Sequence, residues 1–122
     1  MAKILIIDDD EMMRTMIREM LEEDGHTIST AETSSDGVKA AEADPPDLVI
    51  TDIFMPEEGG LEVIRRLTRT LPDTKVLAIS GFDLREGVDI LELARTYGAA
   101  ETLQKPVPAE TVKSTVSKLL GD

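Results

Sequence analysis

The chain has 122 residues, 41% of them hydrophobic and 31% charged, which predicts a single globular domain over residues 1–122 with a sizeable core. It contains no cysteine, which excludes a disulfide framework, a thiolate metal site and a cysteine nucleophile. Its formal net charge of −12 argues against nucleic acid as a direct ligand and favours cations or positively charged partners. The sequence shows neither a signal peptide nor an apolar run long enough to span a membrane, so we expect a cytoplasmic protein.

Apolar runs typical of strands alternate along the chain with stretches whose apolar residues have helical spacing. In chain order we expect a strand at 4–7, a helix at 11–24, a strand at 26–31, a helix at 33–43, a strand at 48–50, a helix at 61–71, a strand at 75–79, a helix at 84–97, a strand at 99–104 and a helix from 108. This alternation is typical of an α/β fold in which helices cover both faces of a parallel sheet.

Several polar residues stand where helices are expected to begin. Asp10 is more readily an N-cap of the helix at 11–24 than a ligand. Asp83 is expected to cap the helix at 84–97, with Glu86 completing a capping box. The methionines of the first helix have the spacing of core residues, and we interpret them as such: Met13, Met16 and Met20.

The composition of the strands predicts their order in the sheet. The runs 4–7, 48–50 and 76–79 are apolar throughout and are expected at the centre, whereas 26–31 and 99–104 contain polar residues and are expected at the edges. With right-handed crossovers this gives a five-stranded parallel sheet of order 2-1-3-4-5, a flavodoxin-like fold. Ligands of such folds bind at the carboxyl ends of the strands, here between the first and third strands.

Charged or hydroxyl side chains follow four of the expected strands. Asp8 and Asp9 follow the first strand, Asp52 the third, Ser80 the fourth and Lys105 the fifth. Carboxylates this close together repel one another unless a cation lies among them, and a site made only of oxygen ligands favours Mg²⁺. A carboxylate nucleophile, a hydroxyl, a lysine and Mg²⁺ together indicate phosphoryl transfer onto Asp52 as an acyl phosphate.

Over its whole length the chain resembles a bacterial two-component response-regulator receiver domain of the single-domain, chemotaxis-regulator-like kind. The resemblance rests on five motifs in this order and spacing: Ile6-Ile7-Asp8-Asp9-Asp10, Asp52-Ile53-Phe54-Met55-Pro56, Gly60-Leu61-Glu62, Ser80-Gly81 and Lys105-Pro106. It implies a signalling module rather than an enzyme, one that promotes only its own phosphorylation and dephosphorylation. A sensor histidine kinase or a histidine phosphotransferase would donate the phosphoryl group. A conformational change would then signal to a downstream protein or effector domain through the 84–120 face.

The same resemblance implies a role for each site residue. Asp52 would be the phosphoacceptor, and the implied metal ligands are Asp9, Asp52, the backbone carbonyl of Phe54 and, mainly through water, Asp8. Ser80 and Lys105 would hold the phosphoryl group, and the bond before Pro106 would be cis.

Two departures from the family pattern affect these expectations. Thr102 stands where the family often has an aromatic residue of its conformational switch, so the sequence does not establish the usual coupling of a buried ring to Ser80. Phe54 and Phe82 stand where smaller or polar residues are frequent, and these rings would crowd the water that hydrolyses the acyl phosphate. We therefore expect a long-lived phosphorylated form.

Two other function classes share some of these features. A phosphatase with an aspartate nucleophile would carry the acids and the lysine but usually has Asp-x-Asp at the nucleophile, and Asp52-Ile53-Phe54 lacks the second acid. An interaction module that works without phosphorylation would not need a complete site. The chain ends about two residues after its last expected helix. It could therefore be a single-domain regulator or a part of a longer one, and composition does not choose between them.

Overall fold

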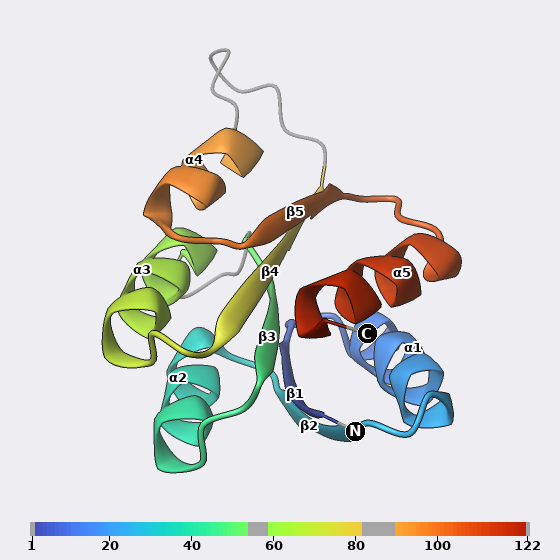
Figure 1. Ribbon diagram of the computed structural model, residues 1–122. Coiled ribbons are helices and arrows are strands. Elements are labelled where there is room, and N and C mark those ends of the chain that lie inside the picture. The colour runs from blue at the N-terminus through green and yellow to red at the C-terminus, as the bar shows by residue number, and fades with distance from the viewer. Residues whose placement is uncertain (1, 54–58, 82–89, 122) are drawn as a thin grey trace.

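The computed structural model describes residues 2–53, 59–81 and 90–121 (Figure 1). Its elements in chain order are β1 (Lys3–Ile7), α1 (Glu11–Glu23), β2 (Thr27–Ala31), α2 (Ser34–Ala43), β3 (Leu48–Asp52), α3 (Gly60–Thr70), β4 (Lys75–Ser80), α4 (Ile90–Tyr97), β5 (Glu101–Gln104) and α5 (Ala109–Leu120). The strands form one parallel sheet in the order β2-β1-β3-β4-β5, which confirms the predicted fold class.

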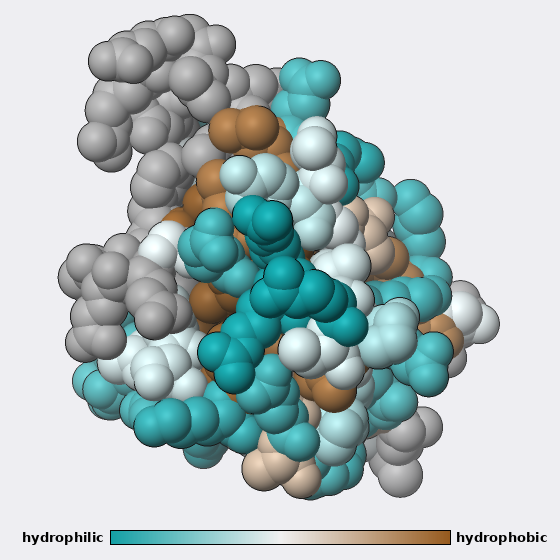
Figure 2. All heavy atoms as spheres, turned by 90° about the vertical axis from the view of Figure 1, so that its left-hand side faces the viewer, coloured by the Kyte–Doolittle hydropathy of each residue, from teal (hydrophilic) through white to brown (hydrophobic). Residues whose placement is uncertain are grey.

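Helices cover both faces of the sheet, with α1 and α5 on one side and α2, α3 and α4 on the other (Figure 1). Successive side chains of a strand point to opposite faces, so Ile4 and Ile6 of β1 belong to the core beneath α1 and α5, while Leu5 and Ile7 belong to the core on the side of α2, α3 and α4. Figure 2 shows the α2–α3–α4 side, where hydrophilic residues gather over the middle of the described surface. Two apolar layers therefore enclose the sheet.

Burial explains which strands lie at the centre. All five residues of β3 are buried, and β1 and β4 are buried after their first residue, whereas β2 and β5 are partly exposed. The register pairs Ile7 with Thr51, Asp52 with Ile79, and Ser80 with Gln104. The carboxyl ends of the four strands that carry the predicted site residues therefore lie side by side.

Helix α1 differs from its prediction in one respect. Asp10 is the N-cap as expected, because its side chain accepts hydrogen bonds from the backbone N–H groups of Met12 and Met13. Met20 is buried and Met13 partly buried, but Met16 is 44% exposed, so the prediction that Met16 fills the core is wrong. Met16 has the helical spacing of a core residue, but the sheet and α5 cover only part of the apolar face of α1, and Met16 lies outside that part.

Helix α4 is described from Ile90 onward, so residues 84–89 of the expected helix and the capping box of Asp83 and Glu86 lie outside the described residues. Pro108 precedes the last helix as its N-cap rather than as its first residue. Among the helices of the described ranges, none is both long enough and apolar enough to cross a bilayer.

Gly60, the first residue of α3, lies directly against the end of β3. A Cβ atom at this position would lie 2.5 Å from the carbonyl oxygen of Asp52 and 2.5 Å from the Cα of Ile53. The Gly60 N–H donates to the Ile53 carbonyl oxygen at 2.8 Å. Because the atoms in the way belong to the backbone, only glycine lets α3 begin this close to Asp52.

We expect Gly60→Ala to lower the free energy of unfolding by about 2 kcal/mol, since the added methyl group must displace the helix or the strand end. Urea denaturation would measure the loss. Gly59→Ala is the matched control, because a Cβ there would meet no atom within 4 Å and its φ of −64° suits any residue. Its loss should be roughly 1 kcal/mol or less. Equal losses in the two variants would contradict the close contact.

Candidate functional site

Three carboxylates gather at the carboxyl edge of the sheet. Asp8 follows β1, Asp9 is next along the chain, and Asp52 is the last residue of β3. Each offers an oxygen atom, and these oxygen atoms all lie within 4.8 Å of one another. Asp8 and Asp52 are buried, with 4% and 8% of their surface exposed, while Asp9 is exposed. The structure therefore brings together the acids that the strand exits predicted.

Lys105 joins this cluster from the end of β5. Its Nζ lies 3.1 Å from Asp52 Oδ2 and 3.5 Å from Asp8 Oδ2, and its side chain is 23% exposed. Its backbone N–H donates to the Ser80 carbonyl oxygen at 2.7 Å, which ties the ends of β4 and β5 together. The bond between Lys105 and Pro106 is cis, as the resemblance implies.

The partly buried site changes the protonation equilibria of two groups. Burial raises the pKa of Asp8, and the neighbouring Asp52 charge raises it further, although the Asp10 N–H and Lys105 act in the opposite direction. For Lys105, burial by itself lowers the pKa, but the attraction of Asp52 and Asp8 outweighs it and holds the pKa above its ordinary value. Lys105 is therefore cationic at neutral pH, whereas ionised Asp8 is destabilised by its position.

Ser80 ends β4 and is fully buried at the same edge of the sheet. Its hydroxyl donates to the Gly81 carbonyl oxygen at 3.0 Å. Thr51, also fully buried, donates to the Asp52 carbonyl oxygen at 3.0 Å. Both hydroxyls thus bond to backbone carbonyls beside the carboxylates, and Ser80 lies at the strand exit where the sequence predicted it.

Asp8 is bonded through every polar atom it has. Its N–H donates to the Ala31 carbonyl oxygen at 3.2 Å, and its own carbonyl oxygen accepts from Arg14 Nη1 at 2.7 Å. Its Oδ1 accepts from the Asp10 N–H at 2.9 Å, and its Oδ2 faces Lys105. These four contacts come from β2, from α1, from the residue before α1 and from the residue after β5, so the position of Asp8 is set independently of any ligand.

Arg14 is the member of this arrangement that the sequence did not single out. It lies on α1 three residues before Ile17 and seven before Leu21, so it shares the face that those buried residues turn toward the sheet. Its side chain is only 11% exposed. A charged residue within a buried helical stripe is the signal that could have identified it.

The cluster fits a hard divalent cation. Carboxylate oxygens are the donors that Mg²⁺ prefers, and two buried acids with one exposed acid leave a side open to solvent for retained waters. Asp8, whose two carboxylate oxygens already accept protein hydrogen bonds, suits a contact through water better than direct ligation. Direct ligation by Asp9 and Asp52, which the resemblance implies, stays a prediction. Phe54, whose carbonyl is the remaining implied ligand, lies outside the described residues.

Of the two departures from the family pattern, the structure describes Thr102 but neither of the two phenylalanines. Thr102 lies half-buried on β5, paired with Ala78 of β4, with no large side chain to move. Phe54 and Phe82 both lie outside the described residues, so the long-lived acyl phosphate stays a prediction.

In the metal-free protein, Asp8→Asn should raise the free energy of unfolding at neutral pH, because a neutral amide removes the unfavourable burial of an ionised carboxylate. The pKa of Asp8 is higher in the folded than in the unfolded state, so the folded state binds this proton more tightly. Ionised Asp8 therefore destabilises the fold above its raised pKa, and this effect disappears as the pH falls through that pKa.

The gain from Asp8→Asn should accordingly be largest at neutral pH and vanish as the pH approaches the ordinary carboxyl value of 3.8. Urea denaturation of both proteins with a chelator present would measure it. A gain that does not depend on pH, or a loss of stability at neutral pH, would contradict the assigned cause.

Comparisons with known proteins agree with this geometry. The family model of the response regulator receiver domain matches residues 4–117. The chain is 34% identical to Protein PilH of Pseudomonas aeruginosa over 121 residues, which cover 99% of both chains. It is 32% identical to the DNA-binding transcriptional regulator NtrC of Azospirillum brasilense, where the match covers 98% of this chain and 24% of NtrC.

A solved structure shows the same fold. The crystal structure of a response regulator receiver domain protein from Clostridium thermocellum has a TM-score of 0.88 and 32% identity, and the match covers 99% of this chain and 95% of that one. The family model spans all of the described acids, Ser80 and Lys105. The chain therefore belongs to the response regulator receiver domain family, the phosphoacceptor signalling module of two-component systems.

Proposed function

We propose that Asp52 is the residue of this chain that accepts the phosphoryl group. One observation carries the proposal: the Asp52 carboxylate ends a fully buried strand, lies 3.1 Å from the Lys105 ammonium and has acid oxygens within 4.8 Å. A rigid strand holds the nucleophile while its carboxylate meets a polar edge, and 8% of the surface of Asp52 is exposed there.

The transfer is a displacement at phosphorus. An Oδ atom of Asp52 forms the new P–O bond, the P–N bond to the donor histidine breaks, and the leaving imidazole nitrogen takes the electron pair. The product is an acyl phosphate on Asp52. Lys105, which lies 3.1 Å from Asp52 Oδ2, would pair with a phosphoryl oxygen, and a turn of the Ser80 hydroxyl away from the Gly81 carbonyl would let it donate to another.

Mg²⁺ is the proposed cofactor, and when bound it would offset the negative charge that builds up between the carboxylates and the phosphoryl oxygens. Asp9, Asp52 and the Phe54 carbonyl would ligate it, with Asp8 acting through water. Lys105 contributes a positive charge that is present with or without the metal, since its pKa is raised.

The chemistry is limited to phosphorylation and dephosphorylation of the chain itself. A phosphatase with an aspartate nucleophile usually has a second acid two residues after the nucleophile, and that position is Phe54 here. A module independent of phosphorylation would gain nothing from three acids held near Lys105, because their repulsion lowers stability. We therefore favour the phosphoacceptor module over both alternatives.

The partners follow from this function. We propose that the donor is a sensor histidine kinase or a histidine phosphotransferase in the cytoplasm. Residues 1–122 would act as one receiver domain, and a downstream protein or effector domain would read the signal through the 84–120 face. The described part of that face comprises α4, β5 and α5.

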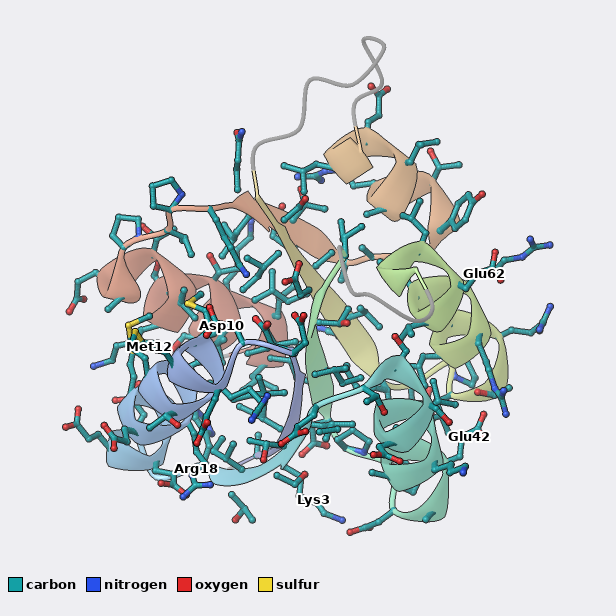
Figure 3. The ribbon with its side chains drawn as sticks, turned by 180° about the vertical axis from the view of Figure 1, so that it is seen from behind. Lys3, Asp10, Met12, Arg18, Glu42 and Glu62 are labelled. Atoms are coloured by element: carbon teal, nitrogen blue, oxygen red, sulfur yellow. The ribbon has the colours of Figure 1, made fainter. Side chains whose placement is uncertain are left out.

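A different surface suits the donor. Met12 and Met16 are the large hydrophobic side chains exposed within the described ranges, at 80% and 44%. They line a shallow groove of about 690 Å³ on α1 whose other lining residues are Asp10, Glu11, Thr15 and Glu19. Figure 3 shows Met12 near Asp10 at the N-terminal end of α1, the end next to the carboxylate edge. An apolar floor with an acidic rim complements a donor surface of apolar and basic side chains.

Phosphorylation tests the central assignment. After incubation with Mg²⁺ and acetyl phosphate, the intact mass of the wild-type protein should rise by one phosphoryl group, whereas Asp52→Asn should show no gain, because the amide is not a nucleophile. Asp36→Asn, at an exposed acid on α2, is the control and should behave as wild type. An equal gain in Asp52→Asn would move the acceptor to another acid, and no gain in the wild type would remove the proposed function.

The donor surface has its own test. Replacing Met12 and Met16 with serine should slow transfer from a phosphorylated histidine phosphotransferase roughly ten-fold, equivalent to about 1.4 kcal/mol, and leave the acetyl phosphate rate unchanged. Glu110→Lys with Lys118→Glu, two exposed positions on α5, is the matched control and should leave both rates unchanged. If the control slows transfer and the methionine variant does not, the donor docks on the 84–120 face instead.

A further inference from the structure

We infer that Arg14 is a positioning residue for the cation site: by holding the carbonyl of Asp8, it orients the exposed Asp9 carboxylate toward Asp52. The inference rests on the proposed function, because it assigns Asp9 as a metal ligand. Arg14 would hold Asp9 in this direction before the metal binds. The affinity for Mg²⁺ would therefore depend on Arg14, although Arg14 is not a metal ligand.

Asp9 has little to hold its own side chain. It is exposed, and within the described residues its carboxylate makes no hydrogen bond or ion pair. Its carboxylate oxygen nevertheless lies within 4.8 Å of the ligand atoms of Asp8 and Asp52. The direction of the Asp9 side chain must therefore come from the backbone on either side of it.

Both neighbours of Asp9 are anchored. On one side, the Asp10 N–H donates to Asp8 Oδ1 and the Asp10 side chain caps α1. On the other side, the Asp8 carbonyl accepts from Arg14 Nη1 at 2.7 Å, the shortest of the four contacts of Asp8. A peptide is planar, so fixing this carbonyl also fixes the N–H of Asp9 and the rotation about the bonds that flank the peptide.

Arg14 is itself held in place. Its side chain is 11% exposed, on the face of α1 that packs toward the sheet, and its Nη2 lies 3.4 Å from Glu32 Oε1 just after β2. A guanidinium can donate to two acceptors at once in a fixed planar geometry, which a lysine ammonium does not reproduce. Arg14 thus connects α1, the end of β1 and the end of β2 at the loop that carries Asp9.

Removing such support for a metal ligand typically lowers metal affinity by one order of magnitude or more. The alternative is that Arg14 only secures α1 to the sheet. A purely structural role would lower the melting temperature of the metal-free protein and leave the Mg²⁺ dissociation constant of the folded molecules unchanged. The two roles therefore differ in a measurable quantity.

The experiment is an NMR titration of the full chain with MgCl₂ at constant ionic strength, which follows the backbone amide shifts of Asp8, Asp9 and Asp52. Arg14→Met should raise the dissociation constant roughly ten-fold, and Asp9→Ala sets the scale for complete loss of that ligand. Arg18→Met is the matched control, since Arg18 is in an exposed pair with Glu22 on the same helix, farther along α1 from Asp10 than Arg14 is (Figure 3). It should bind as wild type does.

A second readout uses the rate of mass gain from acetyl phosphate. If Arg14 positions a metal ligand, saturating Mg²⁺ should return the phosphorylation rate of Arg14→Met to near the wild-type value. The substitution would then raise the Mg²⁺ concentration that the reaction requires and leave its maximal rate unchanged. If Arg14→Met does not fold, Arg14→Lys replaces it, with an expected dissociation constant between those of wild type and Asp9→Ala. The lysine ammonium can bond the Asp8 carbonyl but lacks the planar fork with which the guanidinium also reaches Glu32.

The outcomes separate this inference from the proposed function. A folded Arg14 variant with the Mg²⁺ affinity of wild type, while the wild type binds Mg²⁺ and gains a phosphoryl group, overturns the positioning role alone. A wild type that shows no Mg²⁺-dependent shift and no mass gain overturns the proposed function together with it. Equal weakening in Arg14→Met and Arg18→Met would also overturn the role, because it would reflect the loss of any positive charge on α1.

Discussion

The repulsion among carboxylates at the partly dry edge of the sheet is the constraint on which the rest of the site depends. Asp8, Asp9 and Asp52 hold oxygens within 4.8 Å of one another, and two of these acids are buried. Lys105 supplies a single positive charge against three acids. One ammonium cannot neutralise three carboxylates. The cluster therefore still attracts a further cation, either free or bound to an incoming ligand.

The fold tolerates this repulsion because the surrounding backbone holds the two buried acids, Asp8 and Asp52, close together. The buried strands β1 and β3 end beside each other, Gly60 lets α3 begin against the end of β3, and Asp8 is bonded through each of its polar atoms. The energy to hold the charges together comes from the two apolar layers around the sheet. Binding of a cation would then relieve an existing repulsion without rebuilding the site.

Much of this could be predicted from local patterns. Alternating apolar runs and helical spacings identified the strands and helices, and the fully apolar runs identified the central strands, because only a strand covered on both faces lacks polar residues. Parallel strands all end at one edge of their sheet, so the residues after them could be grouped without coordinates. The N-cap role of Asp10 followed from its position before an apolar helical stripe. The motif order also indicated the family.

The sequence by itself therefore determined which residues stand at the edge of the sheet, and the tertiary structure decided which of them touch. Lys105 meets Asp8 across 97 residues of chain, at a distance set by strand register and crossovers. Arg14 reached a backbone carbonyl that no sequence pattern marks, and Met16 proved exposed because the sheet and α5 cover only part of α1. A local pattern reports the face on which a side chain lies, whereas its neighbours depend on packing between distant segments.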